Sequence, residues 1–370
     1  MALSWWDIPG PCRFVRRVEN DLRDRVNVVA ALPAGLGREW FDFFRRRWVN
    51  DQERIDVLRV SEEATSPLDE LCCAFTTHPA GTITVGALTQ EEGFRGRTVG
   101  VVLNSTEPLQ EWMEFLASYE RKCRLIDVLD RTVLLLVTDG VSPRFLPSPE
   151  THLRVHVYEG YARPHDCYMY VWVLLGAEEK HAWRTELKIA LCAHLAQWDP
   201  RLCEVLSDLD IRSILQPRSS VVALPVGQDN CAVADTDEGW AMGILQRRDG
   251  QVVYHSGWGA KDTSSQEFQR RVWAAQIQVV FPLIEQVRRQ AIERYSSRFR
   301  LPVLVGDDQY VNDPYELEIA MVRRIVSRMG GVPRTVLRQL DLAWEFRNAL
   351  AHLQPLTDRQ LQAFEPSLDI

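Results

Sequence analysis

Six residues near the carboxyl end of the chain combine two side chains that could cleave a phosphodiester bond. The hexapeptide Arg347-Asn348-Ala349-Leu350-Ala351-His352 begins with arginine and ends with histidine. Histidine titrates near neutral pH and can move a proton, while the planar guanidinium of arginine can hold a phosphate through two hydrogen bonds. A single helix would hold both groups rigidly. Held on one helix, Arg347 and His352 could therefore cleave a phosphodiester bond without metal.

The residues that must position this site are predicted to form four helices. The expected helices are residues 266–298, with an interruption at Phe281-Pro282, a second helix that starts at Asp313-Pro314, a third from Pro333 to before Pro355, and a short one from Thr357. The third helix carries the hexapeptide in its last turns. Because a helix advances about 100° per residue, Asn348 and His352 fall on one face with Arg347 beside them.

This arrangement, over about residues 265–370, resembles the HEPN family, whose hallmark is arginine, a polar residue and then a histidine a few residues later. The resemblance implies a metal-independent endoribonuclease of the toxin or anti-phage kind. It implies that His352 is the general acid or base, that Arg347 holds the scissile phosphate and that Asn348 orients the substrate or His352. It also implies a homodimer through this domain, with RNA as substrate.

Two other interpretations of the hexapeptide stay open. A HEPN-like domain can bind RNA or a partner protein without cutting, and basic residues often end helices for purely structural reasons. Arg347 interrupts an apolar stripe on its helix, and a buried charge needs a partner. A phosphate could be that partner, as could a carboxylate such as Glu316, Glu318 or Glu345.

The first 160 residues read as alternating strands and helices. Apolar runs predict strands at residues 26–32, 55–60, 99–103, 133–137 and 153–158, with helices between them that include residues 67–75 and 109–119. Continuous apolar strands alternating with helices indicate a buried parallel sheet. Right-handed crossovers place helices on both of its faces. The predicted fold class is therefore α/β, with an all-helical domain at the carboxyl end.

The first strand-to-helix turn is the place where a nucleotide would bind. A P-loop needs glycines whose N–H groups wrap phosphate, then lysine, then a hydroxyl for magnesium. This turn has Gly35 and Gly37, but Arg38 stands at the lysine position and Glu39 at the hydroxyl position. Asp139, at the end of a later strand, could be a substitute metal-binding acid. We expect no ATP hydrolysis, and if a nucleotide binds, Gly35, Gly37 and Arg38 are the candidates.

The order of these elements resembles the NTPase domain of the STAND branch of AAA-like ATPases, in an inactivated version. A doubly wound α/β domain that binds no nucleotide is an equal alternative. Trp5 and Trp6 could clamp an adenine base, although adjacent tryptophans more often fill the edge of a core.

Residues 161–264 show no recognisable catalytic spacing. They are predicted to contain helices at 177–198 and 200–215, a strand at 221–224, a β-hairpin from 241–246 and 251–255, and a linker at 257–265. We therefore expect three domains: an α/β domain over 1–160, a mixed connecting domain over 161–264 and a helical domain over 265–370.

Composition and short sequence patterns argue against several classes of protein. With no apolar run of about 18 residues we expect no membrane span, and with no C-x-x-C pair among eight cysteines we expect no zinc site. The amino-terminal residues do not read as a signal peptide, so a cytoplasmic protein is expected. The net charge of −8 argues against a protein that coats nucleic acid nonspecifically. Residues 265–370 are nevertheless almost neutral, with 14 arginines and 13 acidic residues.

Two functions follow from these patterns. The first is a bacterial defence or toxin-type protein whose HEPN-like domain cleaves RNA without metal or cofactor. The alternative is a non-catalytic scaffold, adaptor or regulatory subunit of an anti-phage complex, with an inactive NTPase fold and partner proteins of that complex.

Overall fold

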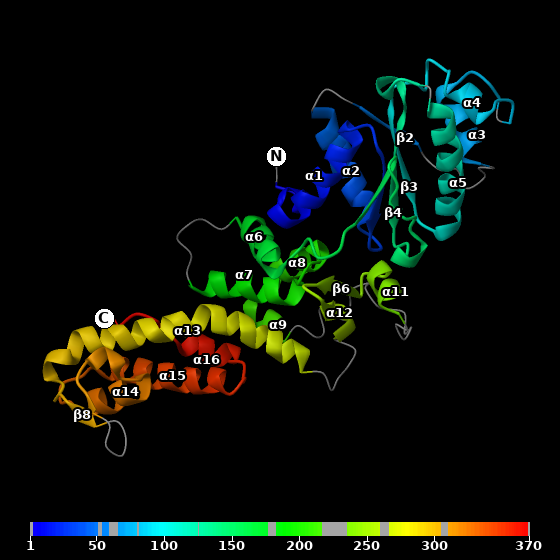
Figure 1. Ribbon diagram of the computed structural model, residues 1–370. Helices are drawn as coiled ribbons and strands as arrows, with labels where there is room; N and C mark the ends of the chain where they lie inside the picture. Colours follow the sequence, from blue (N-terminus) through cyan, green and yellow to red (C-terminus); the bar gives the residue numbers. More distant parts are fainter. Residues whose placement is uncertain are drawn as a thin grey trace. The chain divides into compact units, whose positions relative to one another are not determined.

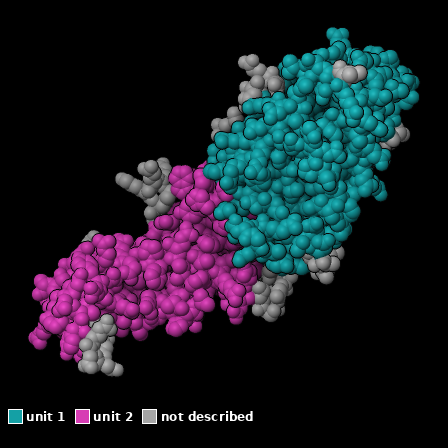
Figure 2. All heavy atoms as spheres, in the orientation of Figure 1, with its two compact units in different colours: residues 1–163, 224–258 teal, residues 164–223, 259–370 magenta. Residues whose placement is uncertain are grey.

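The computed structural model describes residues 3–50, 54–58, 66–79, 81–124, 126–176, 183–216, 235–259, 266–304 and 310–368. Its residues group into two compact units, coloured separately in Figure 2: unit 1 is Met1–Arg163 with Leu224–Trp258, and unit 2 is Pro164–Ala223 with Gly259–Ile370. The three-domain division expected from the sequence stays a prediction, because compactness alone does not show which segments fold independently.

A parallel sheet forms the centre of unit 1. Its five strands are β1 (Asn27–Leu32), β2 (Ile55–Leu58), β3 (Thr98–Leu103), β4 (Val133–Asp139) and β5 (Leu153–Val157). The order across the sheet is β2-β3-β4-β1-β5, and every neighbouring pair is parallel. Each strand lies on one of the predicted apolar runs, which confirms the α/β class. All six residues of β1 are buried, as expected for a strand covered on both faces.

Helices cover both faces of this sheet. Figure 1 shows α1 and α2 on one face and α5 on the other. The helical elements of unit 1 are η1 (Trp5–Asp7), α1 (Pro9–Arg23), α2 (Gly37–Asn50), α3 (Pro67–Phe75), α4 (Val85–Leu88), α5 (Thr106–Cys123), η2 (Val128–Asp130), η3 (Pro143–Phe145) and α11 (Thr236–Ala241). A hairpin is present where one was predicted, as β6 (Leu245–Arg248) paired with β7 (Gln251–Tyr254), but its first strand begins at Leu245 and not at residue 241, which belongs to α11.

The two adjacent tryptophans at the start of the chain are core residues. Trp5 and Trp6 are both buried, and the indole N–H of Trp5 donates to the hydroxyl of Tyr158 at 3.1 Å. The ring of Trp6 meets that of Tyr158 edge-on, with 5.2 Å between the ring centroids. These contacts fill the core between η1 and the residue after β5. The core interpretation is therefore correct, and the adenine clamp is wrong.

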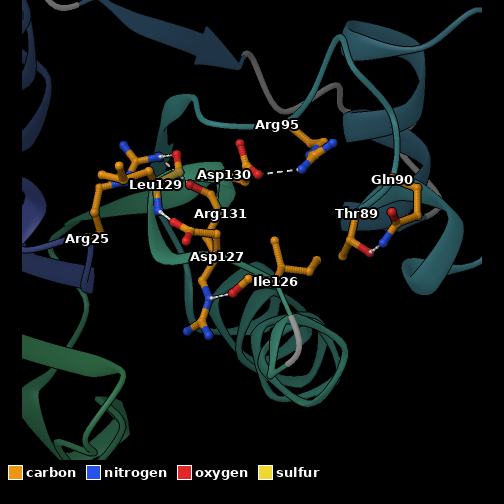
Figure 3. Close-up of polar contacts among 9 residues, drawn as sticks. All are labelled: Arg25, Thr89, Gln90, Arg95, Ile126, Asp127, Leu129, Asp130 and Arg131. Carbon is orange, nitrogen blue, oxygen red and sulfur yellow. Dashed lines mark hydrogen bonds and ion pairs between the residues drawn. The ribbon is translucent and has the colours of Figure 1, made fainter.

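A short loop at the amino ends of the strands is held by arginines (Figure 3). The guanidinium of Arg25 donates to the carbonyl oxygens of Leu129 and Arg131, the first at 3.3 Å. The guanidinium of Arg95 lies 2.5 Å from the carboxylate of Asp130. These bonds attach η2 to the end of α1 and to the loop before β3. They therefore fix the start of β4.

Unit 2 consists mainly of helices. They are α6 (Pro164–Leu174), α7 (Trp183–Ala196), α8 (Pro200–Ser207), α9 (Ile211–Leu215), α13 (Glu267–Tyr295), η4 (Ser296–Arg298), η5 (Pro314–Glu316), α14 (Ile319–Ser327), α15 (Arg334–Ala351) and α16 (Asp358–Ala363). α13 packs against α7, α14 and α15. The short helix α12 (Ser256–Gly259) lies at the boundary of the two units, in part of the predicted linker.

Two predictions about these elements need correction, and one element was not predicted. α13 runs through Pro282 without interruption. Proline removes one intrahelical hydrogen bond, but the buried neighbours Val280 and Ile284 keep this part of the helix packed in the core. Asp313 caps the 3₁₀ turn η5, and α14 begins later, at Ile319. A hairpin of β8 (Val303–Leu304) and β9 (Tyr310–Val311) was not foreseen. The strand predicted at residues 221–224 lies outside the described residues.

Buried thiols are a feature of unit 2. Cys167, Cys192 and Cys203 are free and fully buried. Burial raises the pKa of Cys192 to about 12 and that of Cys203 well above its usual range. A thiol that stays protonated is a poor nucleophile and metal ligand, so these residues act as core side chains.

None of the described helices combines the length and the apolar character that crossing a bilayer requires.

A close approach of α2 to the sheet predicts a stability effect. A Cβ atom at Gly100 in β3 would lie 2.5 Å from two ring carbons of Phe41 in α2. We expect Gly100→Ala to lower the free energy of unfolding of unit 1 by about 1–3 kcal/mol, because the ring must move. Gly330→Ala is the control, since nothing lies within 4 Å of its Cβ position. Calorimetric midpoints measure both, and equal midpoints for the two variants would contradict this packing.

Candidate functional site

The turn between β1 and α2 is closed by a carboxylate of its own chain. Leu32, the last residue of β1, lies beside Asp139, the last residue of β4. The backbone of Gly35 has a φ of +84°, a conformation that favours glycine. In this conformation the Gly35 N–H donates to the Oδ1 atom of Asp139 at 2.7 Å. One of the backbone N–H groups that this turn could offer to a phosphate is therefore already bonded.

Close packing reinforces this closure. A Cβ atom at Gly37 would lie 2.7 Å from the Cβ atom of Asp139, so the glycine that begins α2 permits the approach of Asp139. On the other side of the turn, the Ala34 N–H donates to the carbonyl oxygen of Ala241 in α11 at 2.8 Å. The turn is thus held both by the sheet and by α11.

A large cavity lies at the carboxyl ends of β2, β3 and β4. Its volume is about 800 Å³, and Arg38 and Asp139 both line it, whereas Gly35 and Gly37 are not among its lining residues. Of the three predicted nucleotide-binding residues, Arg38 alone is among the described residues that line this cavity, and a role for the three in nucleotide binding stays a prediction. Ligands of open α/β sheets bind at this edge, so the cavity is the candidate binding site of unit 1.

Carboxylates dominate the charge of this cavity. Among the described residues, two arginines line it, Arg38 and Arg45, against five acidic side chains: Asp42, Glu70, Glu107, Glu111 and Asp139. Asn104 follows β3 at the position where an active P-loop enzyme has its metal-binding acid. No cluster of three or more histidine, cysteine or acidic side chains suited to a metal is found among the described residues. Such a lining repels polyphosphate and attracts cationic groups.

The strand order, the parallel sheet and the turn after β1 define unit 1 as a P-loop NTPase-like fold. No family model matches the chain, and no curated protein matches it.

Comparison with solved structures gives weak likenesses. The Aeropyrum pernix ORC1 protein in complex with DNA is 13% identical, with 94% of this chain and 87% of that chain covered and a TM-score of 0.34. Drosophila ORC bound to GC-rich DNA and Cdc6 is 13% identical, with 95% and 69% covered and a TM-score of 0.26. Drosophila ORC bound to DNA is 11% identical, with 95% and 70% covered and a TM-score of 0.29. Scores this low carry no argument about function.

The carboxyl-terminal hexapeptide lies at the end of α15, as the sequence predicts. His352 is the residue that ends this helix, and its side chain is exposed. The carbonyl oxygen of Leu350 accepts from the indole N–H of Trp273 in α13 at 2.7 Å. Just beyond the helix, the buried Gln276 side chain donates to the carbonyl oxygen of Leu356 at 2.8 Å and accepts from its N–H at 2.7 Å. α13 therefore holds both the helix end and the segment that follows.

Arg347 lies beside a carboxylate. Its Nη2 atom is 3.2 Å from the Oε2 atom of Glu318, one of the three acids considered from the sequence. The side chain is 37% exposed, so the expectation of a buried charge is wrong. A shallow cavity of about 250 Å³ includes Arg347, Glu318, Glu285 and Arg288. Glu285 and Arg288 come from α13, and their place in this cavity was not predictable, because nothing in their spacing links them to the hexapeptide.

The three predicted catalytic residues share one helix end but not one cavity. Neither Asn348 nor His352 is among the described residues that line the cavity beside Arg347. Their catalytic roles therefore remain predictions.

The closed turn predicts how the protein responds to nucleotides. With a carboxylate on the Gly35 N–H and no lysine among the described residues that line the cavity, we expect millimolar ATP or ADP with magnesium to leave the thermal midpoint unchanged, because only a ligand that binds the folded state raises it. Differential scanning fluorimetry measures this. A rise of several degrees that Arg38→Ala removes, but Arg46→Ala on the same helix does not, would show that a nucleotide does bind.

Proposed function

We propose that the chain is a non-catalytic adaptor or regulatory subunit of a multi-protein complex, built on an NTPase-like fold that does not hydrolyse nucleotide. The observation that carries this proposal is the hydrogen bond from Gly35 to Asp139. The Asp139 carboxylate accepts from a backbone N–H group of the turn that could otherwise donate to a phosphate. The residues at the lysine and hydroxyl positions, Arg38 and Glu39, support the same conclusion.

The cavity at the carboxyl edge of the sheet is the surface that we assign to a protein partner. Its excess of carboxylates suits a basic segment, since complementary charge steers association and selects partners. Glu107 and Glu111 lie one turn apart on α5, and both line the cavity. The resemblance to proteins of bacterial conflict systems makes an anti-phage complex the setting in which we place this partner.

A charge reversal tests the assignment. We expect Glu111→Lys to weaken capture of the partner from the native host at least tenfold, because it places a cation where the basic segment binds. Glu114→Lys is the matched control: it lies on the same helix and is exposed, but does not line the cavity. Quantitative affinity purification reads the result. Equal capture by wild type and both variants would remove the cavity from consideration.

RNA cleavage is the second candidate function, and one observation favours it. His352 is exposed and Arg347 is partly exposed on the same end of α15, so solvent reaches both groups. In this proposal His352 moves the proton and Arg347 holds the phosphate after leaving Glu318. A homodimer would pair two such helix ends in one cleft.

The cleavage proposal has a direct test. Purified protein is expected to cleave RNA in EDTA, and His352→Ala is expected to abolish cleavage without lowering the thermal midpoint. His165→Ala, which removes another exposed histidine, serves as the control and should leave cleavage unchanged. Gel analysis of labelled RNA is the measurement. If cleavage is absent, or survives in His352→Ala, the adaptor role alone remains.

A further inference from the structure

A second pocket in unit 1 has the opposite charge to the cavity at the carboxyl edge. It lies between α1 and β5 and has a volume of about 440 Å³. Its lining residues with polar or charged side chains are Arg13, Arg17, His156, Glu159, Tyr161 and Arg163. β5 is an edge strand of the sheet, paired with β1 alone among the described strands. The pocket therefore combines arginine side chains with an edge strand of the sheet.

Two arginines of α1, Arg13 and Arg17, repel each other. Arg13 and Arg17 stand four residues apart on one face of the helix, and both are exposed. Side chains at this spacing are about 5–6 Å apart, and like charges there destabilise a helix by a few tenths of a kcal/mol. Among the described residues, neither guanidinium forms an ion pair with a carboxylate. A bound anion would compensate this repulsion.

One of the two arginines is held in position. The Nη1 atom of Arg17 donates to the Tyr161 hydroxyl at 2.9 Å. Tyr161 stacks parallel to Tyr158, with 5.9 Å between ring centroids, and meets Phe14 edge-on at 5.3 Å. Because both of these neighbours are buried, the tyrosine is fixed. The guanidinium of Arg17 is thereby oriented before any ligand arrives.

The other charges around the pocket are already paired. Glu159 is the one carboxylate among the described lining residues, and its Oε1 atom lies 2.7 Å from the Nε atom of Arg247. The imidazole of His156 contacts Asp21 at 2.5 Å. Arg163 lies 3.1 Å from Asp249, and both side chains are exposed. Among the described residues that line the pocket, Arg13 and Arg17 are therefore the charged side chains that have no oppositely charged partner.

The strand edge adds backbone donors. The carbonyl of His152 and the N–H of Tyr158 bond to β1, at 3.2 Å and 2.8 Å. Because alternate residues of a strand direct their backbone groups to opposite sides, Val155 and Val157 present N–H groups to the outer edge. Both residues line the pocket. Backbone N–H groups and arginines are the donors that proteins commonly direct at nucleic-acid phosphates.

We propose that this pocket binds the phosphate backbone of a nucleic-acid strand and does not read its bases. Two guanidiniums spaced along a helix suit successive phosphates of a polyanion better than a single small anion. The net charge of −8 argues against coating of nucleic acid by the whole surface but not against one local site, because charges beyond about 8–10 Å are screened at physiological salt. This inference goes beyond the adaptor role and uses a separate site.

Fluorescence anisotropy of a labelled thymidine oligonucleotide with the full chain tests the proposal. We expect Arg13→Glu to weaken binding at least tenfold, and Arg13→Gln with Arg17→Gln to make the log–log salt slope less negative by about 1.4, or about 0.7 for each lost contact. Arg121→Glu on α5 is the matched control, an exposed arginine outside the pocket that carries the same charge change.

The outcomes separate cleanly. The proposal is supported if Arg13→Glu lowers the affinity for the oligonucleotide and Arg121→Glu leaves it unchanged. Equal losses with both variants, or none with Arg13→Glu, would overturn it. Wild-type protein that binds inorganic polyphosphate but no oligonucleotide would also overturn it. Arg17 bonds to Tyr161, so the double variant is compared only if its thermal midpoint matches that of wild type. Arg13→Glu removes no described contact and needs no such condition.

Discussion

The hydrogen bond between the Asp139 carboxylate and the Gly35 N–H is the interaction on which the interpretation of unit 1 depends. It requires β1 and β4 to be neighbours, glycine at positions 35 and 37, and a turn that leaves one N–H directed at the sheet edge. A P-loop satisfies such donors with phosphate. Here the carboxylate of Asp139 accepts one of these bonds, so the turn is held by the protein's own side chain.

Much of the fold was predictable because its signals are local. Five apolar runs became the five parallel strands, since strands buried on both faces must be continuously apolar. The interruption predicted at Pro282 was wrong, because the packing of α13 outweighs one lost hydrogen bond. The hairpin of β8 and β9 was missed because two-residue strands leave almost no periodic signal.

The sites were harder to predict because they depend on which strands and helices become neighbours. The sequence showed that Arg38 and Glu39 replace the catalytic residues of a P-loop, but not that Asp139 would bond to Gly35 across a hundred residues. Likewise, a list of glutamates near Arg347 included the correct partner, Glu318, without a means to choose it. The order of strands and the packing of helices, which set these contacts, are not encoded in local spacing.

The buried Gln276 side chain has a consequence for the motion of the hexapeptide. By donating to and accepting from Leu356, its amide takes the place that a peptide group of an adjacent strand would take. The segment after α15 is thus bonded to α13 in the way that a strand is bonded to its neighbour in a sheet. These bonds lie after His352 in the chain. To fray, the carboxyl end of α15 and the segment after it would have to break two buried hydrogen bonds. We therefore expect the backbone amide protons of this segment to exchange slowly with heavy water, although the His352 side chain is exposed.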